Sequence, residues 1–147
     1  MTVRKLDHVN ILSLKYEETL AFYRDLFDMK IGPTPVNDVS RGAWIYDDGD
    51  LPILHVQKVD PADPARKFAD VRRRLGDGMG PRSVEALQGS GTVEHVALQC
   101  QGYDRLLARL RERGIEPRAN EVPGMRLRQL FIADPNDIVL ELNFPGD

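Results

Sequence analysis

The sequence is poor in cysteine and histidine, and each shortage narrows the classes of protein to consider. Of its 147 residues, one is cysteine and three are histidine. The single Cys100 excludes an internal disulfide framework and is typical of a protein from a reducing compartment. Thiolates are also the usual ligands of structural zinc, so a closed structural zinc centre is disfavoured.

Long apolar runs and a strong excess of one charge are absent as well. No stretch has the length of a bilayer-spanning helix or the pattern of a signal peptide. The net charge is only −3, which favours neither nucleic acid nor an anionic membrane as a partner. Apolar residues make up 41% and charged residues 29%, as in ordinary soluble globular proteins. We expect a cytoplasmic protein whose partner is a small molecule, with no nucleic acid and no membrane.

What the sequence does contain is its own opening, twice. Leu6-Asp7-His8-Val9 recurs as Val93-Glu94-His95-Val96, at an offset of 95 − 8 = 87 residues. The ends of the copies correspond too, since Leu54-His55-Val56 matches Leu140-Glu141-Leu142 and 141 − 55 = 86. At the first offset, four further residues recur as Tyr16/Tyr103, Leu20/Leu107, Ala21/Ala108 and Arg24/Arg111. The duplication predicts two copies of one module.

Each copy has the hydrophobic pattern of a βαβββ module. Alternation and β-branched residues predict strands, and apolar residues at three- and four-residue steps predict helices. The predicted strands are 6–14, 29–31, 42–46 and 51–59 in the first copy and 92–99, 115–122, 126–132 and 138–144 in the second; the helices are 17–27 and 103–113.

We therefore expect an α+β fold with a first module at 1–59, a linker at 60–91 and a second module at 92–147, together one compact domain. Asp63 and Pro64 predict the start of a linker helix that ends near Leu75. The glycine-rich segment that follows is either a simple connection or a lid over a site.

All three histidines fall at repeat-related positions, and a glutamate occupies the fourth. Because side chains alternate along a strand, His8 shares a face with Asn10, opposite apolar neighbours that face the helix. A lone histidine on a strand is more often a packed or surface residue than a ligand. Three of three at duplicated positions favour a metal site. We predict one divalent ion, Fe, Mn, Ni, Co or Zn, with four candidate ligands: His8, His55, His95 and Glu141.

The number of ligands stays open. Four protein ligands leave two positions of an octahedron for a substrate with adjacent oxygens. Without His55, the other three residues form a two-histidine, one-carboxylate triad of the type found in non-haem Fe(II) oxygenases.

Further side chains are candidates for binding the substrate because they share a face with these ligands or carry a suitable charge. An arginine in the penultimate strand offers a guanidinium for a carboxylate, with a solvated strand edge as the alternative. The predicted substrate-binding residues are Asn10, Trp44, Tyr46, Arg128, Gln129 and Phe131.

These motifs resemble the vicinal oxygen chelate superfamily, which includes glyoxalase I, methylmalonyl-CoA epimerase, extradiol dioxygenases and fosfomycin and bleomycin resistance proteins. The resemblance covers nearly the whole chain. It implies paired βαβββ modules that form a curved, cup-like mixed sheet around a metal, with helices on the outer face. The motifs are the two His-Val openings, Ala21-Phe22-Tyr23 with Leu26, and Asp134-Pro135-Asn136-Asp137 ahead of Glu141.

Two departures from the family pattern bear on activity. Glyoxalases commonly carry a carboxylate where this chain has His55, so Glu141 is left as the candidate base on the metal. Extradiol dioxygenases carry an active-site tyrosine where this chain has Phe131, and residues 122–127 lack their additional histidine.

The leading hypothesis is therefore a metal-dependent lyase or isomerase of glyoxalase type, with the metal as Lewis acid and Glu141 as ligand and catalytic base. The first alternative is an Fe(II) dioxygenase that uses His8, His95 and Glu141. The second is a resistance protein that binds a small molecule without chemistry. A homodimer is expected because the open face of a sheet needs cover.

Overall fold

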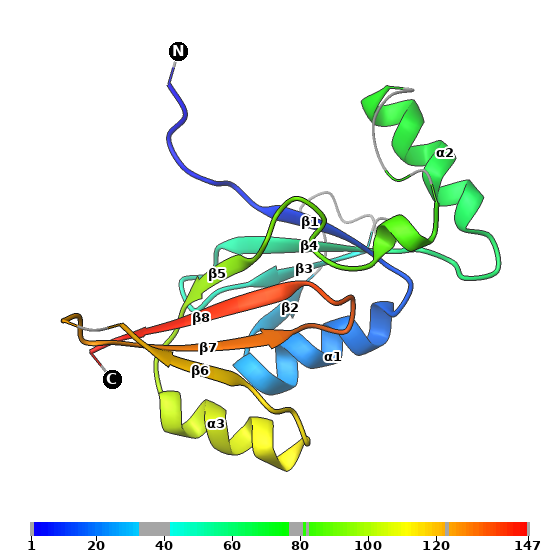
Figure 1. Ribbon diagram of the computed structural model, residues 1–147. Helices are drawn as coiled ribbons and strands as arrows, with labels where there is room; N and C mark the ends of the chain where they lie inside the picture. The colour runs from blue at the N-terminus through cyan, green and yellow to red at the C-terminus, as the bar shows by residue number, and fades with distance from the viewer. Residues whose placement is uncertain (1, 33–41, 77–80, 82, 123, 147) are drawn as a thin grey trace. The chain divides into compact units, whose positions relative to one another are not determined.

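The structure, a computed structural model, describes residues 2–32, 42–76, 81, 83–122 and 124–146 (Figure 1). The chain divides into two compact units, residues 1–87 and 88–147. The segment predicted as a linker, 60–91, belongs to the first unit up to residue 87. Residues 77–80 and 82, in the glycine-rich segment that was predicted as a connection or a lid, lie outside the described residues.

The first unit is built around a mixed four-stranded sheet. Strand β1 runs parallel to β4, and the other neighbours are antiparallel, in the order β1-β4-β3-β2. The elements are β1 (Val9–Ser13), α1 (Tyr16–Phe27), β2 (Lys30–Gly32), β3 (Ala43–Tyr46), β4 (Pro52–Lys58), α2 (Pro64–Leu75) and the 3₁₀ helix η2 (Glu85–Leu87).

The second unit repeats this topology with the strand order β5-β8-β7-β6, and β5 is parallel to β8. Its elements are β5 (Val96–Gln99), α3 (Tyr103–Glu112), β6 (Arg118–Glu121), β7 (Leu127–Ala133) and β8 (Val139–Pro145). The predicted α+β fold with two βαβββ modules is confirmed.

Equivalent strands pair in equivalent register in the two units. Asn10 lies opposite His55 across β1 and β4, and Ala97 lies opposite Glu141 across β5 and β8. The offsets are 97 − 10 = 87 and 141 − 55 = 86, so the sequence repeat is also a repeat of strand pairing.

The turn before the last strand is likewise built twice. The Oδ1 atom of Asp47 accepts hydrogen bonds from the backbone N–H groups of Gly49 (2.9 Å) and Leu51 (2.8 Å). The Oδ1 atom of Asp134 accepts from Asn136 (2.8 Å) and Ile138 (3.0 Å). These aspartates, 87 residues apart, fix the hairpin that sets the register of each last strand.

The core of each unit lies on one face of its sheet. In the first unit Ile11, Leu54 and Val56 are buried, as are Tyr23 and Leu26 on α1, which contacts β4 and β2. In the second unit the buried residues Leu140, Leu142 and Phe144 of β8 form the corresponding face. The Phe144 ring meets the Tyr103 ring of α3 edge-on. The opposite face of each sheet carries the candidate ligands His55 and Glu141, with Trp44 and Phe131 beside them.

Three strands begin three or four residues later than predicted. Strand β1 begins at Val9 and β5 at Val96, so His8 and His95 lie one residue before each strand. Ladder pairing starts only at Val9 with Leu54 and at Val96 with Leu140, and the preceding residues have no strand partner. Strand β6 begins at residue 118, directly after a proline that cannot donate to a ladder.

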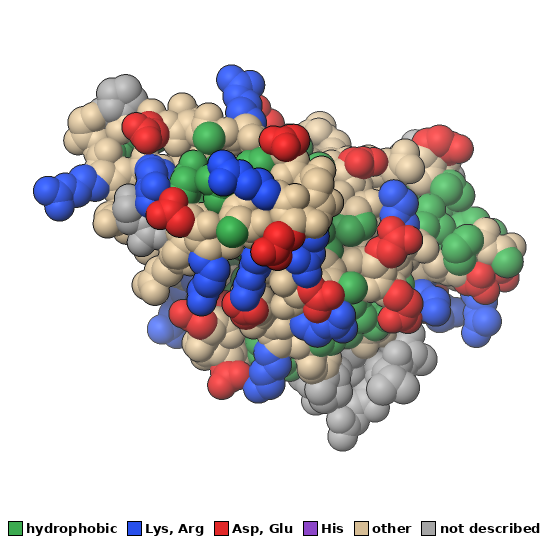
Figure 2. All heavy atoms as spheres, turned by 90° about the horizontal axis from the view of Figure 1, so that it is seen from below, with side chains coloured by type: hydrophobic (Ala, Val, Ile, Leu, Met, Phe, Trp, Pro, Cys, Tyr) green, Lys and Arg blue, Asp and Glu red, His purple; other side chains and the backbone are tan. Residues whose placement is uncertain are grey.

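The linker helix has the predicted bounds because its start signal is local. The Asp63 side chain accepts a hydrogen bond from the Arg66 backbone N–H at 3.2 Å, and Pro64 occupies the first turn. No helix of the described residues has the length and apolar character needed to cross a membrane. On the face drawn in Figure 2, acidic and basic side chains are interspersed rather than gathered by sign.

Candidate metal and substrate site

Two candidate ligands of the first unit, His8 and His55, are gathered around the only tryptophan of the sequence. Trp44 lies opposite His55 across β3 and β4 and stacks on its ring, with centroids 4.6 Å apart and planes 4° apart. The His8 ring meets Trp44 edge-on at 4.6 Å, and the two imidazoles are 6.4 Å apart. Both histidines thus lie on the sheet face that the helix leaves open.

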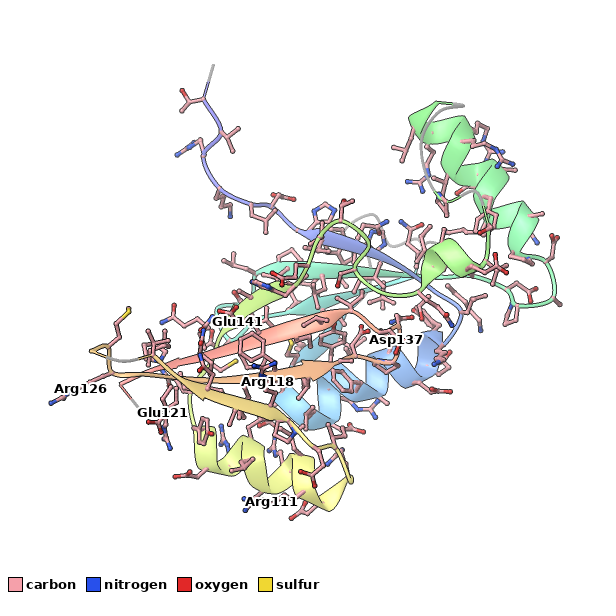
Figure 3. The ribbon with its side chains drawn as sticks, viewed as in Figure 1. Arg111, Arg118, Glu121, Arg126, Asp137 and Glu141 are labelled. Atoms are coloured by element: carbon pink, nitrogen blue, oxygen red, sulfur yellow. The ribbon has the colours of Figure 1, made fainter. Side chains whose placement is uncertain are left out.

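The candidate ligands of the second unit are in direct contact. The Nε2 atom of His95 lies 3.1 Å from the Oε2 atom of Glu141. Glu141 projects from β8, in register with Phe131 of β7 (Figure 3). The pair is partly buried, with side-chain exposures of 34% and 17%.

Each histidine that precedes a first strand has a carboxylate on its other ring nitrogen. The Oδ2 atom of Asp7 lies 2.7 Å from His8 Nδ1, and the Oε2 atom of Glu94 lies 3.3 Å from His95 Nδ1. A carboxylate on one ring nitrogen favours the tautomer in which the other nitrogen is free to bind a metal. This geometry leaves Nε2 as the nitrogen that each of these candidate ligands would offer to a metal.

Amide side chains surround the Glu141 carboxylate. Its Oε1 atom accepts hydrogen bonds from Gln129 Nε2 (3.0 Å) and Asn143 Nδ2 (2.8 Å). Gln129 Nε2 also donates to Asn143 Oδ1 (2.9 Å), and Gln129 Oε1 accepts from Asn120 Nδ2 (2.7 Å). The first unit has one related contact, from Gln57 Nε2 to Asn10 Oδ1 at 2.8 Å.

The predicted substrate-binding residues do not all lie together. Gln129 and Phe131 lie on the same face as Glu141, and Asn10 and Trp44 lie on the open face of the first sheet. Tyr46 is the last residue of β3, and its ring packs against the backbone of Gly32. A Cβ atom added at Gly32 would lie 2.7 Å from the Tyr46 ring.

Arg128 lies on the other face of β7 from Gln129 and Phe131. It pairs with Phe144 and lies on the helix-covered face, with its guanidinium 3.9 Å from the Tyr103 ring centroid and 3.6 Å from the Asp104 carboxylate of α3. A cation held against an aromatic ring on that face is a packing contact rather than a partner of Glu141. We leave Arg128 out of the candidate site.

The donor chemistry of the pairs fits a divalent metal. Imidazole nitrogens and carboxylate oxygens bind such ions at about 2.0–2.2 Å, so two adjacent ligands of one octahedral ion lie roughly 3 Å apart. The 3.1 Å between His95 Nε2 and Glu141 Oε2 matches that separation. Within the described part of the chain, no three histidine, cysteine, aspartate or glutamate side chains form a group that could hold an ion. The four-ligand set therefore stays a prediction.

Sequence reasoning assigned no role to Asn120, Asn143 or Gln57. One signal was present, because Asn143 and Gln57 both follow a candidate ligand by two residues and are themselves repeat partners, with 143 − 57 = 86. The contribution of Asn120 was not visible, since it depends on the register between β6 and β7.

Two βαβββ units with ligand-type side chains on their open faces define a protein of the vicinal oxygen chelate class. The chain belongs to the Glyoxalase/Bleomycin resistance protein/Dioxygenase superfamily, whose family model matches residues 5–142. No curated protein matches the chain.

Solved structures share this fold at low sequence identity. A protein from Bacillus anthracis assigned to the glyoxalase family is 17% identical, with a TM-score of 0.60 over 99% of this chain and 98% of that one. The fosfomycin resistance protein FosX from Listeria monocytogenes is 16% identical, with a TM-score of 0.57 over 97% and 94%. A mutant of FosX, 14% identical with a TM-score of 0.60 over 98% and 94%, was crystallised with Mn(II) and 1S,2S-dihydroxypropylphosphonic acid.

Proposed function

We propose that the protein is a metal-dependent enzyme that acts on a small oxygenated molecule by lyase or isomerase chemistry. Its metal ligands are His8, His95 and Glu141, with His55 as the fourth. The observation that carries the proposal is the contact between His95 and Glu141 at the distance of adjacent ligands. The sequence repeat supports it, because the only histidines of the chain occupy the matching positions.

A divalent ion, when bound, supplies Lewis-acid polarisation of substrate oxygens. The residues of the chain orient the reactants. Asp7 and Glu94 keep the Nε2 atoms of their neighbouring histidines available, and Glu141 presents a carboxylate oxygen beside one of them. Phe131, opposite Glu141, offers an apolar ring with no exchangeable proton, which favours lyase or isomerase chemistry over ring cleavage.

The relatives support a metal and a small substrate. FosX binds Mn(II) together with a phosphonate that has two adjacent hydroxyl groups. We infer that this chain likewise takes a small molecule with neighbouring oxygens. An Fe(II) dioxygenase remains the second candidate, because His8, His95 and Glu141 have the composition of its ligand triad.

The decisive experiment is a metal titration of protein purified without a histidine tag and freed of metal by a chelator. Trp44 is the only tryptophan and stacks on one candidate ligand, so its fluorescence reports binding directly. We expect Mn(II), Co(II) or Ni(II) to bind at one ion per chain and to change that fluorescence. Glu141→Gln should weaken binding, whereas Glu112→Gln, on the exposed surface of α3, should not.

Absence of binding by all three ions and by Fe(II) would refute the metal-dependent function and favour a protein that binds small molecules without a metal. If the metal binds, oxygen consumption separates the two enzyme classes. The proposal expects no oxygen uptake with catechols. Uptake by the iron-loaded protein would replace lyase or isomerase chemistry with the dioxygenase alternative.

A further inference from the structure

The amide cluster around Glu141 has a role that the proposed ligand set does not include. We propose that Gln129 and Asn143 are positioning residues that fix the Glu141 carboxylate, so that only its Oε2 atom is presented to a metal. This inference rests on the proposed function, in which Glu141 is a ligand. It assigns a task to two side chains outside the proposed set of metal ligands.

The hydrogen bonds around Glu141 distinguish its two oxygens. Oε1 accepts one bond from Gln129 and one from Asn143, at 3.0 and 2.8 Å. A carboxylate oxygen has two lone pairs, so two amide donors satisfy Oε1. Oε2 is the oxygen that lies 3.1 Å from His95 Nε2. The carboxylate is therefore oriented for ligation through one oxygen.

The Gln129 amide is itself held in place by hydrogen bonds, so it can orient the Glu141 carboxylate. Gln129 donates to both Glu141 and Asn143 while its own oxygen accepts from Asn120, so every polar atom of its side chain is engaged. Gln129 is only 9% exposed. A buried amide keeps its partners because an unpaired one is unfavourable, so rotation of this side chain is opposed.

Two consequences follow for the chemistry. Ligation through one oxygen leaves an additional coordination position free compared with a carboxylate that binds through both. Proton abstraction by Oε1 is opposed, because it would have to displace two amide donors. This restricts the base role predicted for Glu141 from the sequence.

The test is a Co(II) titration of the metal-free protein, followed by calorimetry and by the visible absorption spectrum of the bound ion. Gln129→Met removes the donor at nearly equal volume, and Asn143→Leu removes the second donor. Loss of a group that orients a ligand weakens metal binding by about 10- to 100-fold, which is the expected result for each. The visible spectrum should also change, because the orientation of the carboxylate at the metal changes.

The matched control is Gln57→Met. Gln57 is the repeat partner of Asn143 and is 4% exposed, but its described hydrogen bond goes to Asn10, which is not a candidate ligand. Its effect on Co(II) affinity should stay within about twofold, well below the range expected for loss of an orienting group. Circular dichroism checks that each variant is folded.

Asn120→Ala is a milder variant because Asn120 lies on the exposed strand β6. It removes the hydrogen bond that Asn120 donates to the Gln129 side chain. It should weaken Co(II) binding severalfold with the same spectral change, and it decides the matter if Gln129→Met does not fold. Folded variants at positions 120, 129 and 143 with wild-type affinity and spectrum would overturn the inference. Failure of the wild-type protein to bind Co(II) would instead refute the proposed function.

Discussion

Replacement of Asp134 by alanine should be among the most destabilising single changes in the second unit. The Asp134 side chain is 3% exposed and closes the turn between β7 and β8. Its Oδ1 atom accepts from two backbone N–H groups, and its Oδ2 atom accepts from the Asn136 side-chain amide at 3.2 Å. Asp137, labelled in Figure 3, marks the same turn.

The magnitude follows from the bonds that are lost. A hydrogen bond to a charged group contributes about 1.5–3 kcal/mol, and a buried donor left unpaired costs about 1–3 kcal/mol. The three contacts share one acceptor group, so their losses do not add fully. We expect Asp134→Ala to lower the free energy of unfolding by about 3–5 kcal/mol.

Asp47 provides the internal comparison because it makes the same two backbone contacts at the surface of the first unit. There water can replace the lost acceptor, so Asp47→Ala should cost only about 1–2 kcal/mol. Equilibrium denaturation in urea measures both values. A loss below about 1 kcal/mol at Asp134, or equal losses at both positions, would refute the argument that burial determines the contribution of this turn.

Three further outcomes are expected. Asp137 has a φ of 62°, a left-handed conformation that glycine adopts without strain, so Asp137→Gly should raise the free energy of unfolding by about 0.5–1 kcal/mol in the same urea assay. Burial raises the pKa of the Cys100 thiol to about 11 from 9.0. The folded state therefore keeps a proton that the unfolded chain loses, and stability should fall between about pH 9 and 11, with a shallower decline in Cys100→Ala. Mn(II) at 100 times its dissociation constant should raise the free energy of unfolding by about 2.7 kcal/mol, and a chelator should reverse this.

Much of the fold was predictable because its signals are local. The Asp63-Pro64 pair marks the start of α2, and the duplicated His-Val openings mark the two modules. The strand starts were less predictable, since they depend on where a partner strand begins. The predicted homodimer and cytoplasmic location stay predictions from the sequence.

The candidate site residues stay a prediction, and Arg128 is one whose position the strand pattern constrains. Because side chains alternate along a strand, Arg128 points to the other face of β7 from Gln129 and Phe131. The strand pattern alone therefore predicts that Arg128 lies on the helix-covered face. The amide cluster could not be inferred in the same way. It depends on which residues of β6, β7 and β8 lie side by side, and a shift of one residue would separate them.

The duplicated turn and the buried residues of the helix-covered face have a consequence for how such a protein changes over time. They hold each sheet together without using the residues of its open face. The two modules accordingly have aspartate at both equivalent turn positions, Asp47 and Asp134, whereas the equivalent positions 55 and 141 carry different residues, His55 and Glu141. One face carries the stability of the sheet, and the other is free to acquire new ligands and new substrates.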